Sequence, residues 1–105
     1  MSDILERLGR VLAQRRNADP GSSYVASLYA AGLPAMRDKI REEAGELAQA
    51  DPGDREALVH EAADVWFHSL VLLAWHGIGP GDVLAELERR FGRSGLDEKA
   101  GRLRE

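Results

Sequence analysis

The spacing of apolar residues along the chain predicts helices throughout and no strands. Apolar side chains recur every three or four positions, which places them on one side of an α-helix. A first helix is expected from about residue 4 to residue 16, with Ser2 or Asp3 as its N-cap and Glu6 completing a capping box. Its apolar side is formed by Ile4, Leu5, Leu8, Val11 and Leu12.

A short helix and a long helix are expected next. Ser23 is placed to cap a helix over residues 24–31, which Gly32 ends. Pro34 suits the first turn of a long helix that continues to about Ala50.

The next helix, over about residues 55–76, is the most apolar part of the chain. The turn at 51–54 is short, so this helix and the preceding one are expected to be antiparallel neighbours. Apolar residues cover most of its circumference, which predicts that it is buried on both sides. We therefore expect an intertwined homodimer with this helix in its core. The broad apolar side contains Val59, Ala62, Val65, Trp66, Leu70 and Leu73.

A final helix is expected from the glycines at 77–81 or Asp82 to about Phe91, with a basic segment at its end and beyond. Together these elements predict an all-α bundle of four to five helices that forms one domain over residues 1–105. Six of the 14 basic residues lie in the last 17 positions, and such a cationic patch suits phosphate oxygens. Ser94 and Asp97 also match a capping box. The alternative is a solvated tail. The six basic residues are Arg89, Arg90, Arg93, Lys99, Arg102 and Arg104.

Composition narrows the classes of function. The chain has 105 residues and a net charge of −4, which disfavours electrostatic binding to nucleic acid. It contains no cysteine, so thiol chemistry and disulfides are excluded. Its N-terminus lacks a signal pattern, and we expect no apolar run that approaches the length needed to span a bilayer. We expect a soluble, cytoplasmic protein with no membrane partner.

Acidic residues on two helices suggest a metal site. Glu43 falls within the apolar stripe of its helix, where a leucine would be expected, and Glu46 lies about one turn further on. Glu61 and Asp64 are three residues apart on the next helix. Burying several unpaired carboxylates would cost more than a small domain's stability, so a cation is expected among them. Oxygen donors favour Mg²⁺, with Mn²⁺ as a second choice.

The alternative for each acid is an ordinary solvated surface position. For Glu42 the two interpretations are equally good, because 18 acidic residues make such spacings common by chance. His68, four residues after Asp64, is placed either to orient that carboxylate or to be a core histidine bonded to a backbone group or a tyrosine.

Six segments follow one another in a characteristic order and spacing, at residues 23–24, 39–46, 61–64, 67–68, 71–73 and 89–102. In this order and spacing they resemble the phosphoribosyl-ATP pyrophosphatase family. The acid motifs alone would indicate only the wider all-α, MazG-type nucleotide pyrophosphatase superfamily. The sequence departs from the family pattern at His60 and Phe67, where an aromatic residue and a tyrosine are usual, and at Gly45, which replaces a bulkier residue.

The resemblance implies hydrolysis of the α–β phosphoanhydride of phosphoribosyl-ATP, the second step of histidine biosynthesis. It implies Mg²⁺ ligation by Glu43, Glu46, Glu61 and Asp64, and a further acid at Glu42 that holds a second ion or positions water. Lys39 matches a basic residue beside the site. The cationic residues Arg89, Arg93, Lys99 and Arg102, with Ser94, are expected to bind the phosphate groups.

Two other functions fit the same residues. One is a house-cleaning pyrophosphatase that acts on dUTP or damaged nucleotides with the same metal site. The other is a non-catalytic dimeric helical module whose acids are solvated.

Overall fold

The described residues, 3–91, fold into five α-helices, and the all-α prediction is confirmed. A computed structural model describes residues 3–91, which contain two short 3₁₀ turns and no strand. The expected helix ends agree with the observed ones to within about two residues. The helices are α1 (Ile4–Gln14), α2 (Tyr24–Ala31), α3 (Leu33–Gln49), α4 (Arg55–Trp75) and α5 (Pro80–Arg90).

Side-chain caps explain where α2 and α4 begin. Ser23 Oγ accepts a hydrogen bond from the Ala26 N–H at the start of α2, and Asp54 does the same for Ala57 at the start of α4. The capping box predicted at the start of α1 is wrong for Asp3, whose side chain makes no capping hydrogen bond. Asp3 instead forms an ion pair with Arg7 at 2.9 Å.

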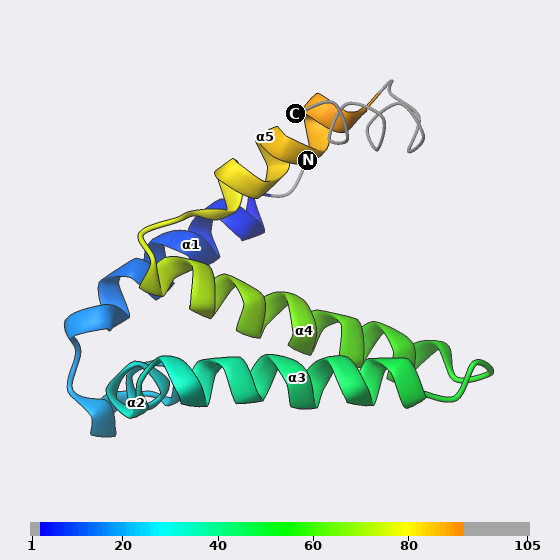
Figure 1. Ribbon diagram of the computed structural model, residues 1–105, viewed down its shortest axis with the longest axis horizontal. Coiled ribbons are helices and arrows are strands. Elements are labelled where there is room, and N and C mark those ends of the chain that lie inside the picture. The colour runs from blue at the N-terminus through cyan, green and yellow to red at the C-terminus, as the bar shows by residue number, and fades with distance from the viewer. Residues whose placement is uncertain (1–2, 92–105) are drawn as a thin grey trace, which may run out of the picture.

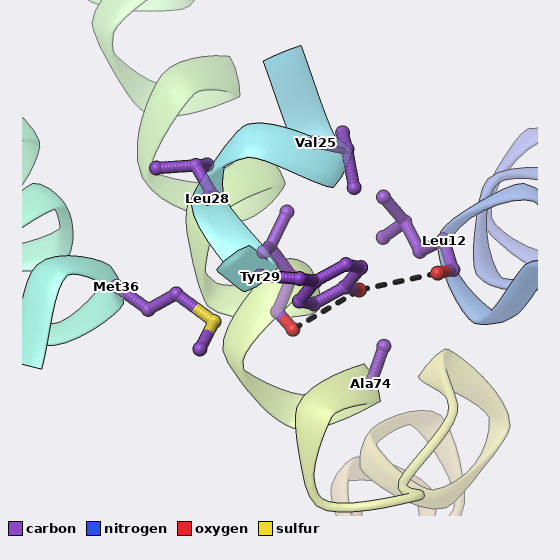
Figure 2. Close-up of a cluster of buried hydrophobic side chains, with 7 residues drawn as sticks. Leu12, Val25, Leu28, Tyr29, Met36 and Ala74 are labelled. Atoms are coloured by element: carbon purple, nitrogen blue, oxygen red, sulfur yellow. Dashed lines mark hydrogen bonds between the residues drawn. The ribbon is translucent and has the colours of Figure 1, made fainter. Parts of the chain in front are cut away.

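The helices form two arms that meet at a small core. Figure 1 shows α3 and α4 side by side as an antiparallel hairpin, with α2 at its base and α1 and α5 extending away from that end. At the junction the Tyr29 hydroxyl donates to the Leu12 carbonyl at 3.2 Å, which ties α2 to α1 (Figure 2). The buried cluster consists of Leu12, Val25, Leu28, Tyr29, Met36, Val71 and Ala74.

The apolar helix α4 is only partly covered by the rest of the chain. Trp66 is 63% exposed, and an apolar groove runs from Trp66 and Leu70 to Leu84 and Leu87 of α5. By length and composition alone α4 could cross a membrane, contrary to the expectation from uninterrupted apolar runs. A single such helix is weak evidence, and this one carries Glu61 and Asp64 and packs along α3.

Candidate metal centre

The centre is formed where the middle of α3 faces the first half of α4. Glu43 lies on the side of α3 that faces α4 and is only 7% exposed, so its predicted position in the apolar stripe is confirmed. Its carboxylate and those of Glu46 and Glu61 offer oxygens that all lie within 4.8 Å of one another. The short turn between the helices brings these acids together, as the sequence predicted.

Two carboxylate oxygens in this cluster are buried and lack partners. Within residues 3–91, neither Glu43 Oε2 nor Glu61 Oε2 has a hydrogen-bond partner. A buried oxygen of an ionised carboxylate without a donor is costly, and most such groups in folded proteins are satisfied. The cluster therefore requires either a proton or a cation.

The raised pKa of Glu43 also indicates that the cluster needs a proton or a cation. Burial raises the pKa of the Glu43 carboxyl, and a side-chain hydrogen bond to Glu46 and the negative charges of Glu46 and Asp64 raise it further. The Lys39 ammonium, 3.5 Å from Glu43 Oε1, lowers this pKa but does not outweigh the other effects. One lysine is thus too little positive charge for the cluster.

Lys39 and Glu42 form the outer part of the centre. The Lys39 Nζ lies 3.5 Å from Glu42 as well as from Glu43. Burial acts to lower the pKa of Lys39, but interactions with Tyr24, Glu42 and Glu43 raise it overall, which keeps the ammonium charged. The Glu42 side chain is 55% exposed, so it reaches solvent beside the buried Glu43.

Asp64 extends the acid cluster along α4 and has a partner that the sequence analysis missed. The His60 Nε2 lies 3.2 Å from Asp64 Oδ2, and His60, Glu61 and Asp64 form a second group of donor atoms within 4.8 Å of one another. The available signal was the four-residue spacing of His60 and Asp64, which places both side chains on one side of a helix.

His68 is a core histidine and does not contact the Asp64 carboxylate. Its Nδ1 lies 2.8 Å from the Asp64 backbone carbonyl, which can only accept, so Nδ1 donates. Its Nε2 then accepts from the Tyr24 hydroxyl at 2.9 Å. Of the two interpretations offered for His68, bonding to a backbone group and a tyrosine is the observed one. The Tyr24–His68 hydrogen bond thereby connects α2 to the part of α4 that carries the acids.

The expected phosphate-binding cations are not brought to the acids by the described part of the chain. Arg89 lies near the end of α5, on the arm that leads away from the hairpin (Figure 1), and donates to Glu86 at 2.6 and 2.9 Å. The expected sites at Arg93, Ser94, Lys99 and Arg102 lie outside the described residues.

The donor set fits a hard divalent cation. Glu43, Glu46, Glu61 and Asp64 supply carboxylate oxygens, the ligand type that Mg²⁺ and Mn²⁺ prefer. The two orphaned buried oxygens are what a bound cation would satisfy. Such a centre can bind a polyphosphate, because the cation offsets the repulsion between the carboxylates and the phosphate oxygens.

Comparison with known proteins agrees with this chemistry. Residues 5–91 match the family model described as phosphoribosyl-ATP pyrophosphohydrolase. A Methylococcus capsulatus protein named phosphoribosyl-ATP pyrophosphatase is 54% identical over 101 residues, covering 95% of this chain and 96% of its own length. The acid cluster and both likenesses agree, and the chain belongs to the phosphoribosyl-ATP pyrophosphohydrolase family.

Proposed function

We propose that this protein hydrolyses phosphoribosyl-ATP to phosphoribosyl-AMP and pyrophosphate with the help of Mg²⁺. Family membership and the name of the 54% identical relative support this reaction, which is the second step of histidine biosynthesis. The observation that carries the metal assignment is the pair of buried, unpartnered oxygens on Glu43 and Glu61.

Four of the acids are proposed to bind Mg²⁺, and Glu42 is proposed to accept a proton. Glu43, Glu46, Glu61 and Asp64 would bind Mg²⁺, which when bound supplies positive charge to the α–β phosphoanhydride and polarises its phosphorus atoms. A water oxygen bonds to one of the two phosphorus atoms while the bond from that phosphorus to the bridging oxygen breaks.

Glu42 is the proposed acceptor of the water's proton. Its carboxylate reaches solvent beside the buried Glu43, and the Lys39 ammonium 3.5 Å away keeps it close to the centre. Lys39 also presents a charged donor for a phosphate oxygen. Arg89, with Arg93, Ser94, Lys99 and Arg102, is proposed to bind the phosphoribosyl and pyrophosphate groups, which requires the Arg89–Glu86 pair to open.

A comparison of Glu42→Gln with Glu43→Gln tests these roles. Glu42→Gln should lower kcat by about 10²–10⁴-fold, the usual contribution of a general base, and should leave Mg²⁺ affinity near the wild-type value. Glu43→Gln should weaken Mg²⁺ binding measured by calorimetry. Loss of Mg²⁺ affinity in Glu42→Gln would make Glu42 a ligand rather than the base.

We also propose that the protein is a cytoplasmic homodimer whose interface includes α4. Trp66 and Val59 of α4 and Leu87 of α5 are each more than half exposed in the single chain. The radius of gyration is 16.1 Å, against about 13 Å for a compact domain of this length. Light scattering should give twice the 11.5 kDa chain mass, and Trp66→Glu should shift it toward the monomer.

A further inference from the structure

The side chain of Tyr24 is a half-exposed aromatic group next to the part of α4 that carries the acids. We propose that its ring stacks on the base of the substrate and selects adenine that is substituted at N1 over plain adenine. Tyr24 is then a specificity-determining residue that lies outside the set of metal ligands. This assignment rests on the proposed function, because it concerns the base of the same substrate.

Two hydrogen bonds in series hold Tyr24 in place. The Tyr24 hydroxyl donates to His68 Nε2 at 2.9 Å, and His68 Nδ1 donates to the backbone carbonyl of Asp64 at 2.8 Å. The rings of Tyr24 and His68 meet edge to face, with centroids 5.8 Å apart and planes at 85°. His68 is only 6% exposed, so the tyrosine is bonded to a buried group that cannot move freely. The aromatic ring is therefore held in one position.

The remaining surface of Tyr24 is open and faces a charged neighbourhood. The residue is 51% exposed although its hydroxyl is bonded within the protein, so the open surface includes the ring. Burial acts to lower the pKa of Lys39, whereas interactions with Tyr24 and two acids raise it, which places Tyr24 within electrostatic range of this ammonium. Lys39 in turn lies 3.5 Å from Glu42 and Glu43. A nucleotide whose phosphates bind at the acids can thus bring its base to the ring.

A ring that is already fixed is a favourable surface for a base. Nucleobases stack on aromatic side chains because both present flat π-faces. A side chain that is held before the ligand arrives loses little conformational freedom on binding, so less of the interaction is offset by ordering. The hydrogen bond to His68 thus prepares Tyr24 for stacking.

The base of phosphoribosyl-ATP differs from that of ATP in its charge. Attachment of the second ribose at N1 of adenine leaves a basic amidine that is protonated at neutral pH, whereas the base of ATP is neutral. A cation over the face of a tyrosine ring is attracted by the negative charge of that face, in addition to stacking. Tyr24 should therefore bind the N1-substituted base more tightly than plain adenine.

The test is calorimetric binding of AMP and of 1-methyl-AMP, in Mg²⁺, to wild type, Tyr24→Phe and Tyr24→Leu. The methyl group at N1 gives the base the same positive charge as the second ribose does. Both variants lose the hydrogen bond to His68, so they differ from each other only in the aromatic ring. Wild type and Tyr24→Phe should bind 1-methyl-AMP about 2- to 30-fold more tightly than AMP, and Tyr24→Leu should bind both with equal affinity.

Two controls separate the base from the rest of the ligand and from the fold. Inorganic pyrophosphate has no base, so its affinity in Mg²⁺ should be the same in all three proteins. With phosphoribosyl-ATP, Tyr24→Leu should have a higher KM than Tyr24→Phe and the same kcat, because the contact is made equally before and during the reaction. Circular dichroism verifies that both variants are folded, since each leaves the buried His68 Nε2 without its partner.

Three results would overturn the proposal. The first is equal affinity of wild type for the two nucleotides, including no measurable binding of either. The second is a preference for 1-methyl-AMP that persists in Tyr24→Leu. The third is an equal loss of that preference in Tyr24→Phe and Tyr24→Leu, because the hydrogen bond rather than the ring would then be responsible. A protein that prefers 1-methyl-AMP through Tyr24 but releases no pyrophosphate would keep this assignment and refute the proposed reaction instead.

Discussion

Glu43 should destabilise the metal-free protein, and its replacement by methionine should therefore raise the melting temperature. Methionine is unbranched like glutamate and suits the apolar stripe in which Glu43 is 7% exposed. Replacing a buried ion pair with apolar residues of similar size is neutral or stabilises proteins by about 1–4 kcal/mol. Lys39, 3.5 Å from Glu43, recovers part of the cost of burying Glu43 and keeps Glu42 as its partner in the variant, so we expect a gain near the lower end of this range.

We expect a gain of about 1 kcal/mol at pH 8 without Mg²⁺, which corresponds to about 4–8 °C in a domain of this size. The pKa of Glu43 is raised in the folded state by burial, a hydrogen bond to Glu46 and like charges. The folded protein therefore holds the proton more tightly than the unfolded chain does. Its stability falls as pH rises from about 4.5 through the folded pKa, and the advantage of Glu43→Met should grow over that range.

The assay is thermal unfolding by circular dichroism at fixed protein concentration, with and without Mg²⁺. Glu42→Met is the matched control: it also removes a charge beside Lys39, but from an exposed position, so stability should stay within about 0.5 kcal/mol. At a Mg²⁺ concentration 100 times Kd, wild type should gain about 2.7 kcal/mol and Glu43→Met should not. A lower melting temperature for Glu43→Met without Mg²⁺ would refute the reasoning.

Three further predictions concern the rest of the fold. A Cβ on Gly9 would lie 2.6 Å from Cδ of Pro80, so Gly9→Ala should destabilise the α1–α5 contact by about 1–3 kcal/mol in thermal unfolding. Gly45→Ala, with nothing within 4 Å of the added Cβ, should raise the free energy of unfolding by about 1 kcal/mol. Equal changes of melting temperature in Gly9→Ala and Gly45→Ala would contradict this account. Hydrogen bonds from Arg89 and Arg90 lower the pKa of Glu86 to about 2. Any contribution of these ion pairs to stability is therefore complete above pH 4.5 and is lost as the pH falls through about 2. Carboxyl NMR should give that midpoint at low salt and move it toward 4.5 in 1 M NaCl, because the pair is exposed; a midpoint insensitive to salt would argue against it.

The main part of the centre could be predicted because it follows from helical periodicity. Glu43 stands among apolar positions three and four residues away, so its burial follows once the segment is helical. The short turn before Asp54 brings α3 and α4 together, which makes the meeting of Glu43 with Glu61 predictable as well.

The detailed partners of the polar side chains could not be predicted, because several partners compete for each group. The side chain of His68 points back along α4 toward the preceding turn and reaches the Asp64 carbonyl rather than its carboxylate. Tyr24, which comes from a different helix, takes the second nitrogen. Arg89 was predicted to bind phosphate groups, but in the structure it donates to Glu86, which lies one turn earlier on α5.

The apolar character of α4 was predicted from the sequence, whereas the arrangement of α1 and α5 was not. Its apolar circumference predicted burial on both sides, which the single chain does not provide, since Trp66 is left exposed. The homodimer that would cover it stays a prediction. Where α1 meets α5, Gly9 lies close against Pro80, a residue 71 positions away in the sequence. No local pattern contains that pairing.

The most direct test of the central claim is pyrophosphate release by the purified protein in Mg²⁺. Phosphoribosyl-ATP, formed in place from ATP and phosphoribosyl pyrophosphate by the transferase that makes it, should be compared with dUTP and a panel of other nucleoside triphosphates. We predict rapid release from phosphoribosyl-ATP and none from the others, with activity lost in Glu43→Gln. Preference for dUTP or another free triphosphate would contradict the assigned substrate, and no release from any nucleotide would contradict a catalytic role for the acid cluster.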